Sequence, residues 1–217
     1  MFARLLALFA ALSVSAAVGD PQTTIAVYLK PGAADAATLE YMKRELAVLM
    51  QSAGFVLEWP DADRIPQTGD AQLVVLELDG ACSAPADAGP SEAGLQSDQL
   101  ASTAASDGKI LPFANLRCEN LNRLVADRLA VEPPARRNQL YARAMARLAA
   151  HELYHVVADS GDHSREGVAK ARLTTSDLLS DGLEFSPEAI GKMHHAIAAG
   201  IPSAAPPASI SESSGQK

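Results

Sequence analysis

The chain has 217 residues, of which 48% are hydrophobic, and it carries 26 acidic against 18 basic residues for a net charge of −8. This acidic balance argues against nucleic acid or an anionic membrane surface as a partner. No segment after the first residues is apolar enough to cross a bilayer, so we expect no stable membrane insertion once a leader is removed.

Residues 1–19 resemble a secretory signal peptide. Arg4 lies in a short basic start, and residues 5–18 form a mostly apolar run. Either Val14-Ser15-Ala16 or Ser15-Ala16-Ala17 offers the small residues that a signal peptidase accepts. The alternative is an anchor that stays attached. Cleavage predicts a secreted or periplasmic protein, in which Cys82 and Cys118 are expected to form a disulfide.

Residues 20–201 are predicted to form one domain, and its first half alternates strand and helix. Residues 23–30 (TTIAVYLK) read as a strand, and residues 34–52 carry apolar side chains at helical spacing. Two further strands follow at 55–59 and 72–78, the second a near-continuous apolar run. This order predicts an α+β domain with a mixed sheet packed on helices.

Residues 81–107 are rich in Ala, Ser, Gly, Asp and Pro, which predicts a long functional loop or a poorly ordered insertion. Residues 110–117 (ILPFANLR) read as a strand. Pro112 favours an edge position for it, because proline cannot donate a backbone hydrogen bond. The edge is either open to another strand or covered by the preceding loop.

The second half of the domain is predicted to be helical. Helices are expected at 119–131, from Pro133-Pro134 to about Asp159, at 175–179 and at 187–199. The last residues, 202–217, are rich in Ser, Ala and Pro and are expected to be a disordered tail.

The run His151-Glu152-Leu153-Tyr154-His155 lies late in the longest predicted helix. Residues four apart share a helix face, so His151 and His155 can present nitrogens to one metal ion. Glu152 then lies beside the metal, where it can accept a proton from an attacking water. Apolar residues at helical spacing lead into the motif, and arginines mark the opposite face: Arg136, Arg143 and Arg147. The alternative is a pair of core histidines bonded to backbone, with Glu152 in a salt bridge to an arginine.

A catalytic zinc ion usually has three protein ligands, and His163 is the best candidate for the third. Gly161 can take the left-handed conformation that returns the chain toward the helix. The alternatives are a solvated loop histidine at this position or a glutamate ligand from a later helix, for which Glu184 is the candidate, with Asp177 and Asp181 behind it.

With this histidine, the motif resembles that of the zincin metallopeptidases, and most of all the metzincin pattern H-E-x-x-H-x-x-G-x-x-H. Seven residues rather than five separate His155 from His163, and Ala158 stands where the family has glycine. Met193, the one methionine after the motif, is predicted to lie inside a helix rather than in the family's methionine turn. The resemblance implies a zincin-like fold with a long active-site helix.

The expected function is that of an exported zinc-dependent peptidase acting on peptides or proteins. His151, His155 and His163 would hold Zn²⁺, and Glu152 would be the catalytic base. One alternative is a non-catalytic, exported zincin-like protein with a structural or vestigial metal site. Another is a helix that serves only as core and binds no metal.

Overall fold

The computed structural model describes residues 23–61, 72–85 and 99–200. The predicted signal peptide, residues 1–19, and the predicted tail, residues 202–217, lie outside the described residues. No helix among the residues that the structure describes is both long and apolar enough to span a membrane.

The described residues form a five-stranded sheet in the order β2-β1-β3-β5-β4. Its strands are β1 (Thr23–Lys30), β2 (Phe55–Glu58), β3 (Gln72–Asp79), β4 (Ala101–Ser106) and β5 (Lys109–Arg117). All neighbouring pairs are parallel except β4 and β5, which form an antiparallel hairpin. The predicted combination of a mixed sheet with helices is confirmed at this level.

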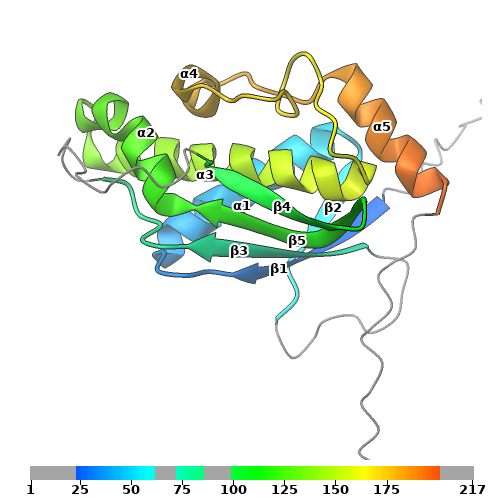
Figure 1. The fold of residues 1–217 in the computed structure, drawn as a ribbon. Coiled ribbons are helices and arrows are strands. Elements are labelled where there is room, and N and C mark those ends of the chain that lie inside the picture. Colours follow the sequence, from blue (N-terminus) through cyan, green and yellow to red (C-terminus); the bar gives the residue numbers. More distant parts are fainter. Residues whose placement is uncertain (1–22, 62–71, 86–98, 201–217) are drawn as a thin grey trace, which may run out of the picture.

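Five helices accompany the sheet in the described part of the chain: α1 (Ala36–Ser52), α2 (Cys118–Ala130), α3 (Pro134–Ala158), α4 (Thr175–Leu179) and α5 (Pro187–Ala198). In Figure 1, α1 and α3 cover one face of the sheet, and α4 and α5 lie over α3 on the side away from the strands. The central helix α3 is therefore covered on several sides, which explains why 16 of its 25 residues are buried.

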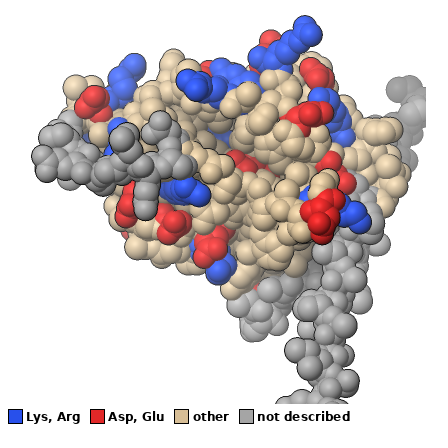
Figure 2. All heavy atoms as spheres, in the orientation of Figure 1, with Lys and Arg blue, Asp and Glu red and all other residues tan. Residues whose placement is uncertain are grey.

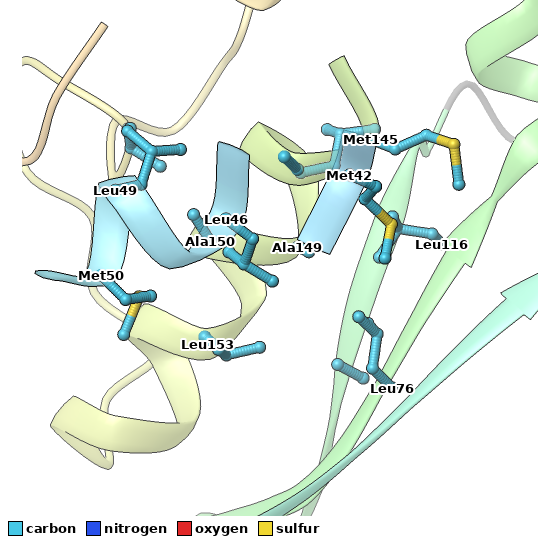
Figure 3. Packing of buried hydrophobic residues seen from close by; sticks show 14 of the residues in the cluster. Met42, Leu46, Leu49, Met50, Leu76, Leu116, Met145, Ala149, Ala150 and Leu153 are labelled. Atoms are coloured by element: carbon cyan, nitrogen blue, oxygen red, sulfur yellow. The ribbon is translucent and has the colours of Figure 1, made fainter. Parts of the chain in front are cut away.

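The hydrophobic core lies where α1 and α3 meet the sheet (Figure 3). Leu46 of α1 is fully buried against α3, where Ala149 and Ala150 are small enough to let the two helices approach closely. Leu76 and Leu116 extend the same cluster from β3 and β5. This packing fixes the position of α3 relative to the sheet.

The prediction that the strand with Pro112 lies at the edge of the sheet is wrong. β5, which contains Pro112, lies between β3 and β4, and β4 is the edge strand. Pro112 is tolerated because pairing with β3 begins only at Phe113, and because the register with β4 shifts between Thr103 and Ala105 opposite this position. The predicted long loop at 81–107 is correspondingly wrong over 101–106, which is β4.

The prediction that Arg147 marks the outer face of the motif helix is also wrong. Its side chain is buried and donates hydrogen bonds to the carbonyls of Asp177, at 2.6 Å, and Leu178, at 2.9 Å. These carbonyls belong to α4, which covers that face of α3 and binds the guanidinium through its last turn. Burial lowers the pKa of Arg147 to about 10, so the side chain is charged at neutral pH.

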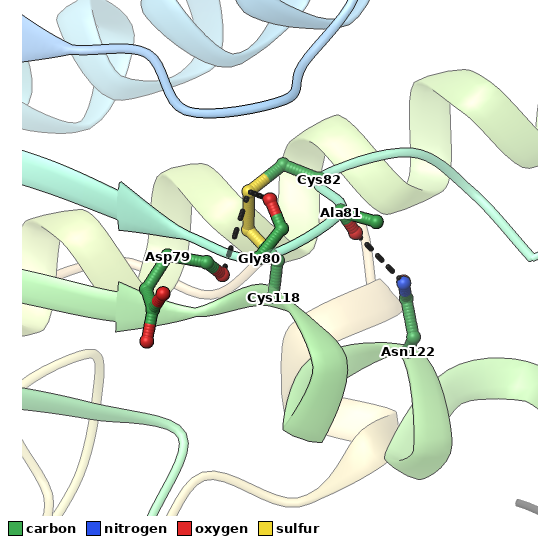
Figure 4. The surroundings of a disulfide bond; sticks show 6 residues. All are labelled: Asp79, Gly80, Ala81, Cys82, Cys118 and Asn122. Carbon is green, nitrogen blue, oxygen red and sulfur yellow. Dashed lines mark hydrogen bonds between the residues drawn. A yellow bond between two sulfur atoms is a disulfide. The ribbon is translucent and has the colours of Figure 1, made fainter.

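The predicted disulfide is confirmed. Cys82 and Cys118 are bonded, so the end of β3 is tied to the first residue of α2 (Figure 4). Asn122, one turn further along α2, donates to the carbonyl of Ala81 at 3.0 Å. Together these contacts hold α2 against the carboxyl end of β3.

The α1–α3 interface gives a direct test of the core. We expect Leu46→Ala to lower the free energy of unfolding by about 3 kcal/mol, because it leaves a cavity at a fully buried site. Val48→Ala on the same helix, where the side chain is 66% exposed, should change it by less than about 0.5 kcal/mol. Urea denaturation measures both, and equal effects of the two variants would contradict this packing.

Candidate metal centre

Three histidines come together at the C-terminal end of α3. His151 and His155 lie one turn apart on that helix, and His163 reaches them from the segment that follows it. One ring nitrogen from each residue lies within 4.8 Å of the other two. The ring centroid of His163 lies 5.2 Å from that of His151 and 4.8 Å from that of His155. Among the described residues, this is the group whose donor atoms are placed to hold a metal ion.

Backbone carbonyls orient the two helical imidazoles. Nδ1 of His151 lies 2.9 Å from the carbonyl oxygen of Val168, and Nδ1 of His155 lies 2.7 Å from that of Ser160. A carbonyl only accepts, so each Nδ1 carries the hydrogen and donates it. In the neutral rings, both Nε2 atoms are then without hydrogen.

These two Nε2 atoms face each other at 3.2 Å. Neither has a hydrogen to donate, so their lone pairs repel unless a cation lies between them. A tetrahedral zinc ion with bonds of about 2.0–2.1 Å separates its nitrogen ligands by about 3.3 Å. The Nε2–Nε2 spacing and the chemistry of these two donors therefore fit a single metal ion held between His151 and His155, and a donor nitrogen of His163 lies within 4.8 Å of both.

Burial keeps the two helical rings neutral. It lowers the pKa of His151 to about 4, against which the hydrogen bond to Val168 acts in the opposite direction. The pKa of His155 is lowered as well, again mainly by burial. Neutral imidazole is the form that binds a metal, so neither ring has to lose a proton at neutral pH.

The chain turns toward His163 at Asp159, not at Gly161 as predicted. Asp159 has φ = 45° and ψ = 46° and ends α3 in the left-handed conformation, whereas Gly161 has no positive φ. Aspartate tolerates this conformation better than most residues, and its Oδ1 accepts a hydrogen bond from the backbone N–H of Ile110 at 3.3 Å. The β4–β5 hairpin thus helps to fix the bend.

The loop after the bend is held by its own backbone. The N–H of Ser164 donates to the carbonyl of Ala169 at 2.9 Å, and the N–H of Val168 donates to that of Glu184, also at 2.9 Å. Gly167 has φ = 74°, and a Cβ there would lie 2.5 Å from the Glu184 carbonyl oxygen. Only glycine fits this close approach, which positions the Val168 carbonyl that orients His151.

Glu152 lies next to the histidines and is 4% exposed. Oγ1 of Thr103, from β4, donates to its Oε2 at 2.6 Å. The salt bridge to an arginine, weighed as an alternative from the sequence, is absent among the described residues. Burial raises the pKa of Glu152 to about 7, while the Thr103 hydrogen bond acts to lower it. A carboxyl with this pKa is suited to exchange protons near neutral pH.

The centre opens into a cleft of about 1000 Å³. Its walls are β4, α2, the end of α3 and residues 171–173, and its lining includes Thr103, His151, Glu152, His155 and His163. In Figure 1, β4 and the segment after α3 lie on either side of α3, and the surface between them is hollowed in Figure 2. Charged side chains in that view lie mainly around the hollow.

The alternative ligands from the sequence are engaged elsewhere. Asp177 accepts from Lys170 at 2.7 Å, and Asp181 pairs with Arg143. Glu184 is exposed and is not part of the histidine group, although its backbone carbonyl supports the loop. Met193 is fully buried in α5, as predicted, and packs in the core.

Sequence reasoning missed Thr103, because residues 101–106 (ASTAAS) have few residues typical of strands. One available signal was Asp107-Gly108, since this dipeptide is typical of a two-residue hairpin turn. Both residues have positive φ, 52° and 76°, and they connect β4 to β5. The turn would have placed Thr103 on a strand beside α3.

Comparisons with known proteins found no protein-family model, no curated protein and no solved structure that matches this chain.

Zinc binding tests the three-histidine arrangement. We expect about one zinc per wild-type chain after dialysis. Loss of a group that only orients a metal ligand weakens zinc binding by about 10- to 100-fold. Loss of a ligand costs more, so His163→Ala should weaken zinc binding by more than this. The control is His195→Ala, an exposed histidine of α5 outside the group, which should bind zinc like wild type. Elemental analysis and competition with a chelator measure both, and equal affinity of the two variants would exclude His163 as a ligand.

The buried carboxyl predicts a pH-dependent difference in stability between wild type and Glu152→Gln, both freed of metal. The pKa of Glu152 is about 7 in the folded chain and has an ordinary value of 4.5, which applies to the unfolded chain. Between these values the folded chain binds one proton more, so wild type loses stability as the pH rises from about 4.5 to about 7. The free energy of unfolding of the glutamine variant, measured relative to wild type, should therefore be about 3 kcal/mol higher at pH 8 than at pH 4. The lowered pKa values of His151 and His155 are common to both proteins and cancel in the comparison. Denaturation curves at both pH values measure this difference. If the free energies of unfolding of variant and wild type differ by the same amount at pH 4 and at pH 8, the pKa of Glu152 is not raised.

Proposed function

We propose that this chain is a zinc-dependent peptidase of the zincin type, in which His151, His155 and His163 hold the metal and Glu152 is the catalytic base. The proposal rests on the Nε2 atoms of His151 and His155, which carry no hydrogen and lie 3.2 Å apart. The buried carboxyl of Glu152 lies beside them, and the site opens into a cleft. The H-E-x-x-H sequence supports it as a resemblance. Three imidazole donors suit zinc and other transition metals and disfavour Mg²⁺ and Ca²⁺, which prefer oxygen ligands; three histidines with an open fourth position are typical of catalytic zinc.

A zinc ion at this site would lower the pKa of a coordinated water from about 15.7 to about 7 and polarise a substrate carbonyl. Glu152 would accept the proton of the attacking water and pass it to the leaving nitrogen. Thr103 holds Oε2 of this carboxyl, so the other oxygen is left to exchange the proton.

The edge strand β4 supports a peptide as the substrate. It pairs with β5 on one side only, and its other side borders the cleft. An extended peptide can add to such an edge through main-chain hydrogen bonds. The lining side chains of β4 are small, among them Ala101, Ser102 and Ala105, and leave room for a substrate backbone. A peptide bound there lies beside Glu152, because Thr103 of the same strand contacts this residue.

We also propose that the protein is exported, as the sequence predicts from residues 1–19. The Cys82–Cys118 disulfide supports this, because such bonds persist in oxidising compartments outside the cytosol.

The test is Glu152→Gln, which keeps the size of the side chain and its hydrogen bond from Thr103 but removes the base. We expect zinc to stay bound while turnover of a peptide library falls by about 10³-fold or more. The control is Glu184→Gln, the alternative ligand from the sequence, which should keep both zinc and turnover. Full activity of Glu152→Gln would rule out Glu152 as base. Zinc-loaded wild type without chelator-sensitive turnover would instead favour the non-catalytic metal site.

A further inference from the structure

The cleft differs in charge from the rest of the protein. The chain has a net charge of −8, yet the residues that line the cleft include two arginines, Arg123 and Arg172, and a single carboxyl, Glu152. A bound divalent ion would add further positive charge. The cleft is therefore a locally basic surface on an acidic protein, which favours anionic groups in a ligand.

The two segments that carry these arginines meet beside the cleft. Arg123 belongs to α2, and its neighbour Leu124 accepts a hydrogen bond through its carbonyl from Thr175 Oγ1, the first residue of α4, at 3.3 Å. Arg172 lies in the segment that leads into α4. This contact brings the two arginine-bearing segments together. The amide of Asn120 donates to the carbonyl of Gln99 at 2.8 Å, so α2 also adjoins the start of β4.

The two guanidinium groups are not neutralised within the described part of the chain. Neither forms an ion pair there. Arg123 is half-buried and donates to the side-chain oxygen of Asn120, a neutral acceptor, and the exposed side chain of Arg172 forms no hydrogen bond with a described residue. Arg143 and Arg147 differ, because Arg143 pairs with two carboxylates and Arg147 is bonded to the last turn of α4. Arg123 and Arg172 thus keep N–H donors for a ligand.

We propose that the cleft binds a carboxylate of the substrate through Arg123 and Arg172, so that the enzyme prefers acidic peptides. The planar guanidinium matches a carboxylate with two parallel hydrogen bonds, which gives direction as well as charge. The carboxylate comes from an acidic side chain or from a free C-terminus. The inference rests on the proposed peptidase function and adds a substrate class to it.

The test compares matched peptides. Quenched fluorogenic peptides carry Glu or Gln at one position at a time, and each is made with a free or an amidated C-terminus. We expect kcat/KM for the best Glu or free-acid peptide to exceed that of its neutral partner by about 10- to 100-fold, as for a charged hydrogen bond. A preference that follows internal Glu identifies the side chain, and one that follows the free acid identifies the C-terminus.

Variants connect this preference to the two arginines. Arg123→Gln and Arg172→Gln should each reduce the ratio of acidic to neutral kcat/KM toward one. Arg123→Glu should favour a Lys peptide over its Glu counterpart. The control is Arg128→Gln, an exposed arginine of α2 outside the cleft lining, which should keep the wild-type ratio. An unchanged ratio in both glutamine variants would overturn the proposal.

A binding measurement separates this inference from the peptidase function. Zinc-loaded Glu152→Gln should bind the labelled Glu or free-acid peptides more tightly than the neutral ones in fluorescence anisotropy, and Arg123→Gln in the same background should remove the difference. If wild type cleaves no peptide but this difference is seen, the peptidase function fails and the carboxylate site stands. If wild type cleaves peptides with no acidic preference and binding shows none, the carboxylate site fails alone.

Discussion

The site depends on the repulsion between two imidazole lone pairs that backbone carbonyls force to face each other. His151 and His155 each use Nδ1–H on a carbonyl, and this leaves their Nε2 atoms bare at 3.2 Å. Burial opposes relief by protonation, because it lowers the pKa of both rings. A divalent cation removes the repulsion and replaces the hydration that the buried groups have lost. The arrangement is therefore costly without a metal and favourable with one.

The fold sustains this cost by fixing α3 on several sides. The sheet and α1 pack on one face of the helix, and α4 and α5 cover the other. The loop after Asp159 supplies the Ser160 and Val168 carbonyls and brings His163 to the helix, while β4 supplies Thr103 to the carboxyl of Glu152. The groups on α3 are thus held by the loop that follows the helix and by β4, so the geometry is set before a ligand binds.

Local signals in the sequence predicted most elements but not their pairing. The spacing of His151, Glu152 and His155 on one helix follows from helical periodicity. The starts of α4 and α5 are local as well, because in the structure the side chains of Thr174 and Ser186 cap them. The edge position of β4 depends on long-range pairing and on a bulge opposite Pro112, which no local pattern encodes. Likewise, helical periodicity places Arg147 on the face opposite the motif, but it cannot show that α4, about 30 positions later in the chain, covers that face.

X-ray absorption at the zinc edge of the purified protein reports the atoms around the metal in solution and so tests the three-histidine site. We expect a four-coordinate zinc with three imidazole nitrogens and one further light atom at about 2.0–2.1 Å. In His163→Ala protein loaded with excess zinc, the imidazole scattering should fall to that of two rings. A wild-type spectrum with no imidazole scattering, or with sulfur ligands, would show that the histidines do not hold the metal.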